Sequence, residues 1–245
     1  MSDEVLGLHD VGVRFGSQWA LRHVTLSIAV GERVALVGPS GADKTTLLSL
    51  FNGTVAPTEG RVSVLGEALP SSGRRGRARR TRIGTIRQGF DLIGSLQVVH
   101  NVNAGRLGRW SVARAATSLL RPRDIDDVRA ALARTGIEHK LYARTDELSG
   151  GELQRVALAR VLVQDPEVVL ADEPISNLDP ARAREIMDLL HTLALRRRAL
   201  LVALHDIDFA RSHFDRLVGL RQGQIVFDGA PNDVDATDFD ALYRT

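Results

Sequence analysis

The sequence predicts an α/β fold built on a mostly parallel sheet, and two observations lead to this prediction. The apolar segment Arg33–Val37 has the composition of a buried strand, and it leads through a glycine-rich stretch into a helix that begins near Lys44. From residue 166 onward, apolar strand-like segments alternate with helix-like ones, as in sheets whose parallel strands are joined by helices. With 245 residues, of which 44% are hydrophobic, the chain is long enough to bury a substantial core.

The remaining elements follow in chain order. Val5–Phe15 and Val24–Ile28 are strand-like, and Pro57–Gly60 is typical of a turn that leads into another strand, Arg61–Leu65. Residues 97–147 show mostly helical patterns of apolar residues, and the chain contains no internal repeat. We therefore expect an α/β core that is interrupted by a helical insertion.

Composition and charge exclude several classes of protein. The chain has no cysteine, which excludes a disulfide framework and a thiolate metal site. The net charge is only +2, although the pI is about 9.5, and this balance gives little reason to expect nucleic-acid binding. No apolar run approaches the ~20 residues that a membrane-spanning helix needs, and the acidic start Met1–Glu4 is unlike a signal peptide. We expect a cytoplasmic protein that is soluble on its own.

Residues 38–46 nearly match the phosphate-binding pattern, in which a glycine is followed after a short gap by Gly-Lys-Ser/Thr. Backbone N–H groups of such a loop, together with the positive end of the following helix, surround phosphates. Lys44 would reach the β- and γ-phosphates, and the Thr45 hydroxyl would hold Mg²⁺. The alternative is a glycine-rich turn with a chance Lys-Thr pair. The candidate nucleotide-binding residues are Gly38, Pro39, Ser40, Gly41, Ala42, Asp43, Lys44, Thr45 and Thr46.

Asp43 stands where the phosphate-binding pattern has its second glycine. A carboxylate ~5 Å from a phosphate charge costs roughly 3 kcal/mol at an effective dielectric of ~20, which is about a hundredfold in affinity. Aspartate tolerates the left-handed backbone conformation better than most residues other than glycine, so the loop itself can still form. We expect weakened ATP binding or slowed turnover, unless Mg²⁺ or a nearby arginine offsets the charge.

Two further segments carry candidate chemistry. Residues 166–174 form an apolar strand that ends in Asp172 and Glu173. Beside a phosphate loop, one such carboxylate can hold Mg²⁺ and the other can orient or deprotonate water; the alternative is an ordinary strand with a polar turn. Leu148–Gly151 reads Leu-Ser-Gly-Gly before a helix. Ser149 would usually be a helix cap, whereas N–H groups beside two glycines would form an anion site.

The order of these segments resembles that of the ATP-binding-cassette (ABC) ATPases, with the Leu-Ser-Gly-Gly signature between the loop and the acidic strand, and the resemblance covers nearly the whole chain. It implies a P-loop NTPase fold with a RecA-like core, an antiparallel β subdomain and a helical subdomain, in a single domain over residues 1–245. Residues 1–90 and 165–245 would form the core and the β subdomain. Residues 91–164 would form the helical subdomain, which ends in the signature helix.

The resemblance also implies roles for individual residues. Phe15 is similar to the aromatic residue that stacks on adenine, and Gln88 is similar to the glutamine that contacts Mg²⁺ and couples to the permease. Asp172 resembles the Mg²⁺-associated acid, Glu173 the general base and His205 the switch histidine that contacts the γ-phosphate. Taken alone, Phe15 is as readily a core residue, Gln88 a surface residue and His205 a structural one.

A paired arrangement follows from the same resemblance. In ABC ATPases the signature of one protomer closes over the phosphates bound by the other, so Ser149, Gly150 and Gly151 would complete the site of a second copy in a head-to-tail dimer. Ser176–Asp179 resembles the loop that crosses between the protomers. The implied cofactors are ATP and Mg²⁺, and the implied reaction is water attack on the γ-phosphate. The implied partners are transmembrane permease subunits and, indirectly, a substrate-binding protein, with the chain at the cytoplasmic face of the membrane and no nucleic acid.

A narrower resemblance lies in the insertion. Residues 95–108, with Ala-Gly-Arg-Leu-Gly at 104–108, are similar to the corresponding segment of phosphonate-importer ATPases, and residues 204–208 and 219–229 are similar to their C-terminal halves. This similarity implies import of phosphonate or a related phosphorus oxyanion. Besides Asp43, the sequence departs from the family at three positions, of which the last two are expected to affect the permease docking surface: Asn177, His100 and Asn103.

The arginine run between residues 74 and 82 has no aromatic residue within it. A solvated connector is the simplest interpretation, and contact with nucleic acid or with anionic lipid is the alternative. The arginines are Arg74, Arg75, Arg77, Arg79, Arg80 and Arg82.

Two other functions stay open on the sequence. One is an ABC ATPase without a permease that acts on nucleic acid or ribosomes, although such proteins usually carry paired cassettes or long coiled-coil insertions. The other is a nucleotide-binding scaffold without hydrolysis, which Asp43 favours.

Overall fold

A six-stranded sheet with the order β10-β9-β3-β8-β7-β6 forms the centre of the molecule in a computed structural model that describes residues 4–69, 73–176, 178–194 and 198–243. Its neighbouring strands are parallel except for β10, which is antiparallel to β9. This order confirms the predicted mostly parallel sheet. The strands are β3 (Arg33–Val37), β6 (Ile83–Ile86), β7 (Val168–Asp172), β8 (Ala199–Leu204), β9 (Arg216–Arg221) and β10 (Gln224–Gly229).

A smaller antiparallel sheet has the order β2-β1-β4-β5. The long hairpin of β1 and β2 shares a hydrophobic core with the large sheet and with the first helix. Leu8, Leu47 and Phe51 belong to this core. The strands are β1 (Glu4–Phe15), β2 (Gln18–Ala29), β4 (Glu59–Val64) and β5 (Glu67–Ala68), and the helix is α1 (Lys44–Phe51).

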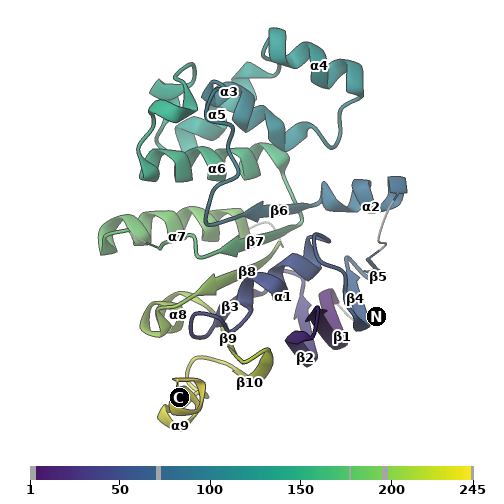
Figure 1. Ribbon diagram of the computed structural model, residues 1–245. Helices are drawn as coiled ribbons and strands as arrows, with labels where there is room; N and C mark the ends of the chain where they lie inside the picture. Colours follow the sequence, from purple (N-terminus) through teal and green to yellow (C-terminus); the bar gives the residue numbers. More distant parts are fainter. Residues whose placement is uncertain (1–3, 70–72, 177, 195–197, 244–245) are drawn as a thin grey trace.

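Both faces of the large sheet are covered. Val34 and Leu36 of β3 belong to the core that contains α1, whereas Ala35 and Val37 belong to the core that contains residues of α6 (Gly150–Gln164) and α7 (Pro180–Ala194). Figure 1 shows α1 and the small sheet on one side of the large sheet, and α6 and α7 on the other. Because both faces are buried, these strands are apolar throughout, which made them recognisable in the sequence.

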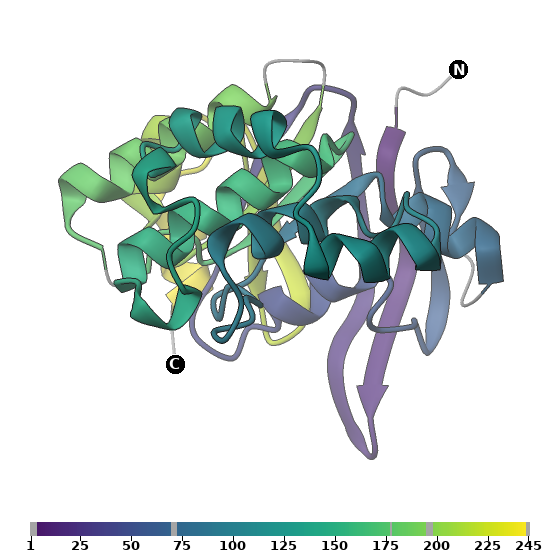
Figure 2. The same ribbon diagram turned by 90° about the horizontal axis from the view of Figure 1, so that it is seen from above.

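A helical layer encloses a third core, to which Val98, Val128 and Val156 contribute. Its elements are α3 (Val98–Asn103), α4 (Val112–Leu120), α5 (Ile125–Arg134), α6 and the short 3₁₀ helices η1 (Ala104–Arg106), η2 (Glu138–Lys140) and η3 (Thr145–Glu147). Figures 1 and 2 show α4 at the rim of this layer. The remaining helices are α2 (Gly73–Arg80), α8 (Ile207–His213) and α9 (Ala236–Tyr243). Within the described residues, no helix is both long and apolar enough to cross a membrane.

Two elements differ from the sequence prediction. β2 begins at Gln18 rather than Val24, because the hairpin register continues to the pair Phe15–Gln18 while exposed Arg22 and His23 conceal the strand pattern. Residues 73–80 form the helix α2, although their sequence contains almost no apolar residue from which a helical period could be read.

Candidate functional site

The carboxyl ends of four neighbouring strands bring the predicted site residues to one edge of the large sheet. Val37 at the end of β3 pairs with Leu204 at the end of β8, and Asp172 at the end of β7 pairs with Ala203. Ile86 at the end of β6 lies beside Ala171. Segments far apart in the sequence therefore meet at the edge where ligands bind in open α/β sheets.

The phosphate loop has a backbone that suits close approach to a ligand. A Cβ on Gly38 would lie 2.1 Å from the carbonyl oxygen of Leu220, so a larger residue cannot occupy this position without movement of the backbone. Gly41 has φ 79°, in the left-handed region that favours glycine. Helix α1 begins at Lys44, as predicted, and Asp43 caps it with φ 71° and without a side-chain hydrogen bond to the helix backbone.

Lys44 lies inside the loop, with only 5% of its surface exposed. Its Nζ donates to the carbonyl oxygens of Gly38 at 2.8 Å and Pro39 at 3.1 Å. Burial lowers the pKa of Lys44, and the negative charges of Glu173 and Asp172 oppose that shift. The lysine is thus held by neutral carbonyl groups in a position from which it can bind an anion.

The Asp43 side chain turns toward the first turn of α1, where the Thr46 hydroxyl donates to its Oδ1 at 3.1 Å. Burial raises the pKa of Asp43, and the bond from Thr46 opposes this shift. Asp43 also lines a cavity of about 620 Å³ whose other walls are mainly polar: Ser17, Gln18, Trp19, Arg22, Gly41, Gln222 and Gln224. Asp43 adopts the left-handed conformation that aspartate tolerates better than most residues other than glycine.

The three candidate metal ligands line one cavity of about 450 Å³, to which Thr45, Gln88 and Asp172 all contribute. The Thr45 hydroxyl donates to Asp172 Oδ2 at 2.7 Å, while the buried Oδ1 of Asp172 has no hydrogen-bond partner. Burial is the main cause that raises the pKa of Asp172, and the Thr45 bond opposes it. A hydroxyl, an unpaired carboxylate oxygen and an amide are oxygen donors of the kind that Mg²⁺ prefers, so these residues fit that ion.

Glu173 follows Asp172 beside this cavity, and its carboxylate contacts Nε2 of His205. The Glu173 backbone has φ 50°, and its N–H donates to the carbonyl oxygen of Ala203 at 3.1 Å. His205 Nδ1 lies 3.4 Å from Lys44 Nζ. A non-glycine residue with positive φ stores strain of the kind found at functional sites. Here it turns the Glu173 carboxylate away from the strand and toward His205.

The signature residues lie elsewhere. Ser149 is the N-cap of α6, and a complete capping box joins it to Glu152: Glu152 Oε2 accepts from the Ser149 N–H at 2.8 Å, and Ser149 Oγ accepts from the Glu152 N–H at 3.4 Å. Ser149 and Gly150 are exposed. None of the three signature residues lines the cavity that contains Thr45 and Asp172. Within one chain, therefore, the structure does not bring the signature to the phosphate loop.

Helix α6 is nevertheless connected to the segment that follows Gln88. Arg160 of α6 donates to the carbonyl oxygens of Phe90 at 2.9 Å and Asp91 at 2.7 Å. No pattern in the sequence indicates this contact, because the acceptors are backbone atoms 69 and 70 residues away.

Phe15 is 56% exposed at the end of β1, which excludes the alternative that it is a core residue. Its stacking role stays a prediction. In the segment 176–179, Asp179 Oδ1 accepts from the N–H groups of Ala181 and Arg182 at 3.1 Å and so caps α7, whereas Asn177 lies outside the described residues.

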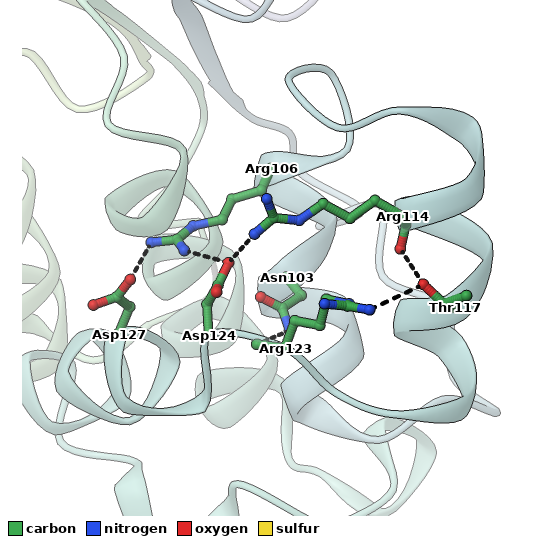
Figure 3. Close-up of polar contacts among 7 residues, drawn as sticks. All are labelled: Asn103, Arg106, Arg114, Thr117, Arg123, Asp124 and Asp127. Carbon is green, nitrogen blue, oxygen red and sulfur yellow. Dashed lines mark hydrogen bonds and ion pairs between the residues drawn. The ribbon is translucent and has the colours of Figure 1, made fainter.

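Asn103 corrects an expectation about the docking surface. It is only 3% exposed, its Nδ2 donates to the Arg123 carbonyl oxygen at 2.8 Å, and its Oδ1 has no partner. Figure 3 shows it beside an ion-pair network in which Asp124 binds Arg106 at 2.8 Å and Arg114 at 3.1 Å. Asn103 therefore stabilises the loop before α5 from inside, and it cannot form part of a docking surface. His100 is half-buried.

The arginine run is not simply a solvated connector. Arg79 is 8% exposed, forms an ion pair with Glu67 and donates to the Ala68 carbonyl oxygen at 2.6 Å. The buried Arg79 attaches α2 to β5, so the connector interpretation is wrong for it, whereas the exposed Arg82 pairs with Glu167 just before β6 and β7. The side chains of Arg74 and Arg75 lie outside the described part of the chain.

Fold and site together define a nucleotide-binding ATPase of the P-loop class. A family model described as ABC transporter matches residues 21–176. The chain is 48% identical over 240 residues to the phosphonates import ATP-binding protein PhnC of Anaeromyxobacter dehalogenans, covering 98% of this chain but 48% of that protein, so it spans about half the length of that relative. It is 45% identical to PhnC 1 of Pseudomonas savastanoi pv. phaseolicola, over 91% of this chain and 85% of that protein.

Similar solved structures are also ATP-binding cassettes of ABC transporters. The structure of cbiO1 from Clostridium perfringens, part of the ABC transporter complex cbiONQ, is 30% identical with a TM-score of 0.80, over 95% of this chain and 91% of that one. A dimeric post-hydrolysis state of the ATP-binding cassette MJ0796 bound to ADP and Pi is 29% identical with a TM-score of 0.77, over 92% and 98%. The chain belongs to the ABC transporter family of ATP-binding proteins, and the predicted ABC ATPase fold is confirmed.

Proposed function

We propose that this chain is the ATP-hydrolysing subunit of an importer for phosphonate or a related phosphorus oxyanion. The observation that carries the ATPase part is the meeting of Lys44, Asp172 and Glu173 at one sheet edge beside a phosphate loop. The substrate class rests on the relatives, which are named as phosphonate import proteins.

In this proposal the loop and the start of α1 bind the triphosphate through backbone N–H groups. Lys44 exchanges its carbonyl partners for phosphate oxygens, and Phe15 stacks on the adenine. Thr45, Gln88 and Asp172 would hold Mg²⁺, which would offset the negative charge of the phosphates. The unpaired Oδ1 of Asp172 supports this assignment, because a buried carboxylate oxygen without a partner is costly unless a ligand completes it.

Glu173 acts as the general base that orients and deprotonates the attacking water, and His205 contacts the γ-phosphate. The contact between them supports these roles, since it places the Glu173 carboxylate beside the His205 ring. Lys44 stabilises the charge that develops as the γ-phosphate leaves. Gln88, in the same cavity as Thr45 and Asp172, senses the metal and passes its state to the permease.

Two copies close head to tail on two ATP molecules, with Ser149, Gly150 and Gly151 of each copy contacting the phosphates held by the other. The exposure of the α6 tip supports this arrangement, as does the dimeric cassette among the similar structures. ATP contacts both copies only in the closed state, so its binding shifts the population toward closure.

The proposed partners are transmembrane permease subunits and, indirectly, a substrate-binding protein, with the chain at the cytoplasmic face of the membrane and no nucleic acid bound. We also assign residues 1–90 and 165–245 to the core and β subdomain and residues 91–164 to the helical subdomain. The third core, formed within residues 98–163, supports that division.

A nucleotide-binding scaffold without hydrolysis is the second candidate, and the specific observation in its favour is the carboxylate of Asp43 at the start of α1. The two candidates differ in turnover and not in nucleotide binding.

The deciding experiment measures ATP hydrolysis by the chain in complex with its copurified permease, with and without phosphonates, for the present sequence and for Asp43→Gly. The proposal expects hydrolysis that phosphonate stimulates in the presence of the binding protein. Nucleotide binding without turnover in either form would support the scaffold, and failure to copurify with any permease would contradict the importer.

A further inference from the structure

The last helix of the described residues, α9, contacts the backbone of His205. At the end of α9, the Tyr243 hydroxyl donates to the backbone carbonyl oxygen of His205 at 3.3 Å, across 38 residues of chain. Burial, with a contribution from the charge of Asp206, raises the pKa of Tyr243. Tyr243 is 44% exposed, and because the ordinary pKa of a phenol is about 10, its hydroxyl can donate throughout the neutral range.

Helix α9 is fixed independently of this contact. Leu242, next to Tyr243, is fully buried in the core that contains α7 and α8. The ring of Phe239 packs edge-on against Phe227 of β10 with centroids 5.8 Å apart, and the guanidinium of Arg211 lies 5.3 Å from the Phe239 ring centre. Figure 1 shows α9 beside β10 at the same end of the molecule as α8. The helix that carries Tyr243 is thus held in place by contacts that do not involve the tyrosine hydroxyl.

The other groups around His205 belong to the proposed site. Its Nε2 pairs with Glu173, and its Nδ1 lies 3.4 Å from Lys44 Nζ. Immediately afterwards, Asp206 caps α8 by accepting from the Phe209 N–H at 2.9 Å. The side chain of His205 is therefore held by groups that a nucleotide would rearrange, whereas Tyr243 and the α8 cap hold its backbone from outside the site.

We propose that Tyr243 is a positioning residue that fixes the backbone of His205 so that its ring keeps the correct place between Glu173 and the phosphate loop. The inference rests on the proposed ATPase function and adds that the C-terminal helix is required for its full rate. Without the hydroxyl, the His205 ring is unchanged but spends less time between Glu173 and the phosphate loop. The kcat for ATP hydrolysis therefore falls, while ATP binding is preserved.

The test compares Tyr243→Phe, which removes only the hydroxyl, with Tyr142→Phe as a matched control. Tyr142 is the other tyrosine of the chain, 54% exposed on the helical layer. The full-length chain is assayed for ATP hydrolysis and for thermal unfolding. We expect Tyr243→Phe to lower kcat about three- to fivefold, the effect of one modest hydrogen bond, with an unchanged KM for ATP and an unchanged unfolding midpoint. Tyr142→Phe should change none of these.

A second readout does not depend on hydrolysis. In chain labelled on the histidine rings, the NMR signal of His205, assigned by its loss in His205→Asn, should shift in Tyr243→Phe and stay in place in Tyr142→Phe. An unmoved His205 signal, an unchanged kcat, or an equal loss of kcat in Tyr142→Phe would each overturn the positioning role. Absence of hydrolysis in every form, including Asp43→Gly, would instead contradict the proposed ATPase function, and the NMR comparison would still decide the contact.

Discussion

The starts of α1 and α6 differ in a way that explains why one chain holds only part of the proposed site. At α1 the cap residue, Asp43, bonds to the Thr46 hydroxyl and leaves the first backbone N–H groups of the helix without a side-chain acceptor. At α6, Ser149 and Glu152 satisfy each other's backbone N–H groups in a complete capping box. The first-turn N–H groups of α1 are therefore left for water or a ligand. At α6 the box leaves the exposed Gly150 N–H and the neighbouring Gly151 N–H without a side-chain acceptor, so they can be presented to another molecule.

The strongest test of this difference is a variant that blocks ATP hydrolysis beside the phosphate loop but still allows two copies to close on ATP. Glu173→Gln should lower ATP hydrolysis at least a hundredfold, the range typical of a general base, while ATP-bound dimers accumulate. Turnover and gel filtration with ATP measure the two effects. Glu167→Gln is the matched control and should hydrolyse normally, because Glu167 lies just before the start of β7 and pairs with Arg82. Equal hydrolysis by Glu173→Gln and the present chain would refute the base assignment.

Removal of the charge at the start of α1 should have the next largest effect. Asp43→Gly is expected to tighten ATP binding by up to about a hundredfold, because a carboxylate ~5 Å from a phosphate costs roughly 3 kcal/mol. Calorimetric titration of the chain with Mg-ATP measures the affinity.

Asp43→Asn separates charge from backbone effects, since asparagine also tolerates the left-handed conformation. If asparagine recovers most of the gain, the charge is responsible; if only glycine does, the backbone is. If neither substitution changes the affinity for ATP, the hypothesis that Asp43 impairs binding is wrong.

The smallest effect is expected at α6. Ser149→Ala removes the cap, which is worth ~1 kcal/mol, and should weaken ATP-dependent dimerisation about fivefold without changing ATP binding by one chain. Ser111→Ala is the control, because Ser111 caps α4 in the same layer by accepting from Arg114. Sedimentation with and without ATP compares the two variants. A similar loss of dimer in both would show that general helix stability, and not the signature, is being measured.

Much of the fold was predictable because buried parallel strands are apolar along their whole length. β3, β7 and β8 were visible for this reason, and the loop between β3 and α1 was recognisable from Gly38, Lys44 and Thr45. Helix α2 was missed because its arginine-rich sequence has no apolar period, and the exposed side chains of Arg22 and His23 concealed the first half of β2.

Part of the candidate site could be predicted and part could not. The strand ends placed Asp172, Glu173 and His205 at one edge, as their position after apolar segments suggested. The burial of Asn103 was not predictable, because its partner is the backbone carbonyl of Arg123. The contact of Tyr243 with His205 was hidden for the same reason, since a bond to a distant backbone atom leaves no pattern in the sequence.

The contact of Arg160 links α6 to the segment that follows Gln88. Ser149 caps the start of α6, and about one turn before the other end Arg160 donates to the carbonyl oxygens of Phe90 and Asp91, just after Gln88. In the proposed dimer, a movement of α6 as a rigid body would move Ser149 and the segment after Gln88 together, because Arg160 joins that segment to the helix.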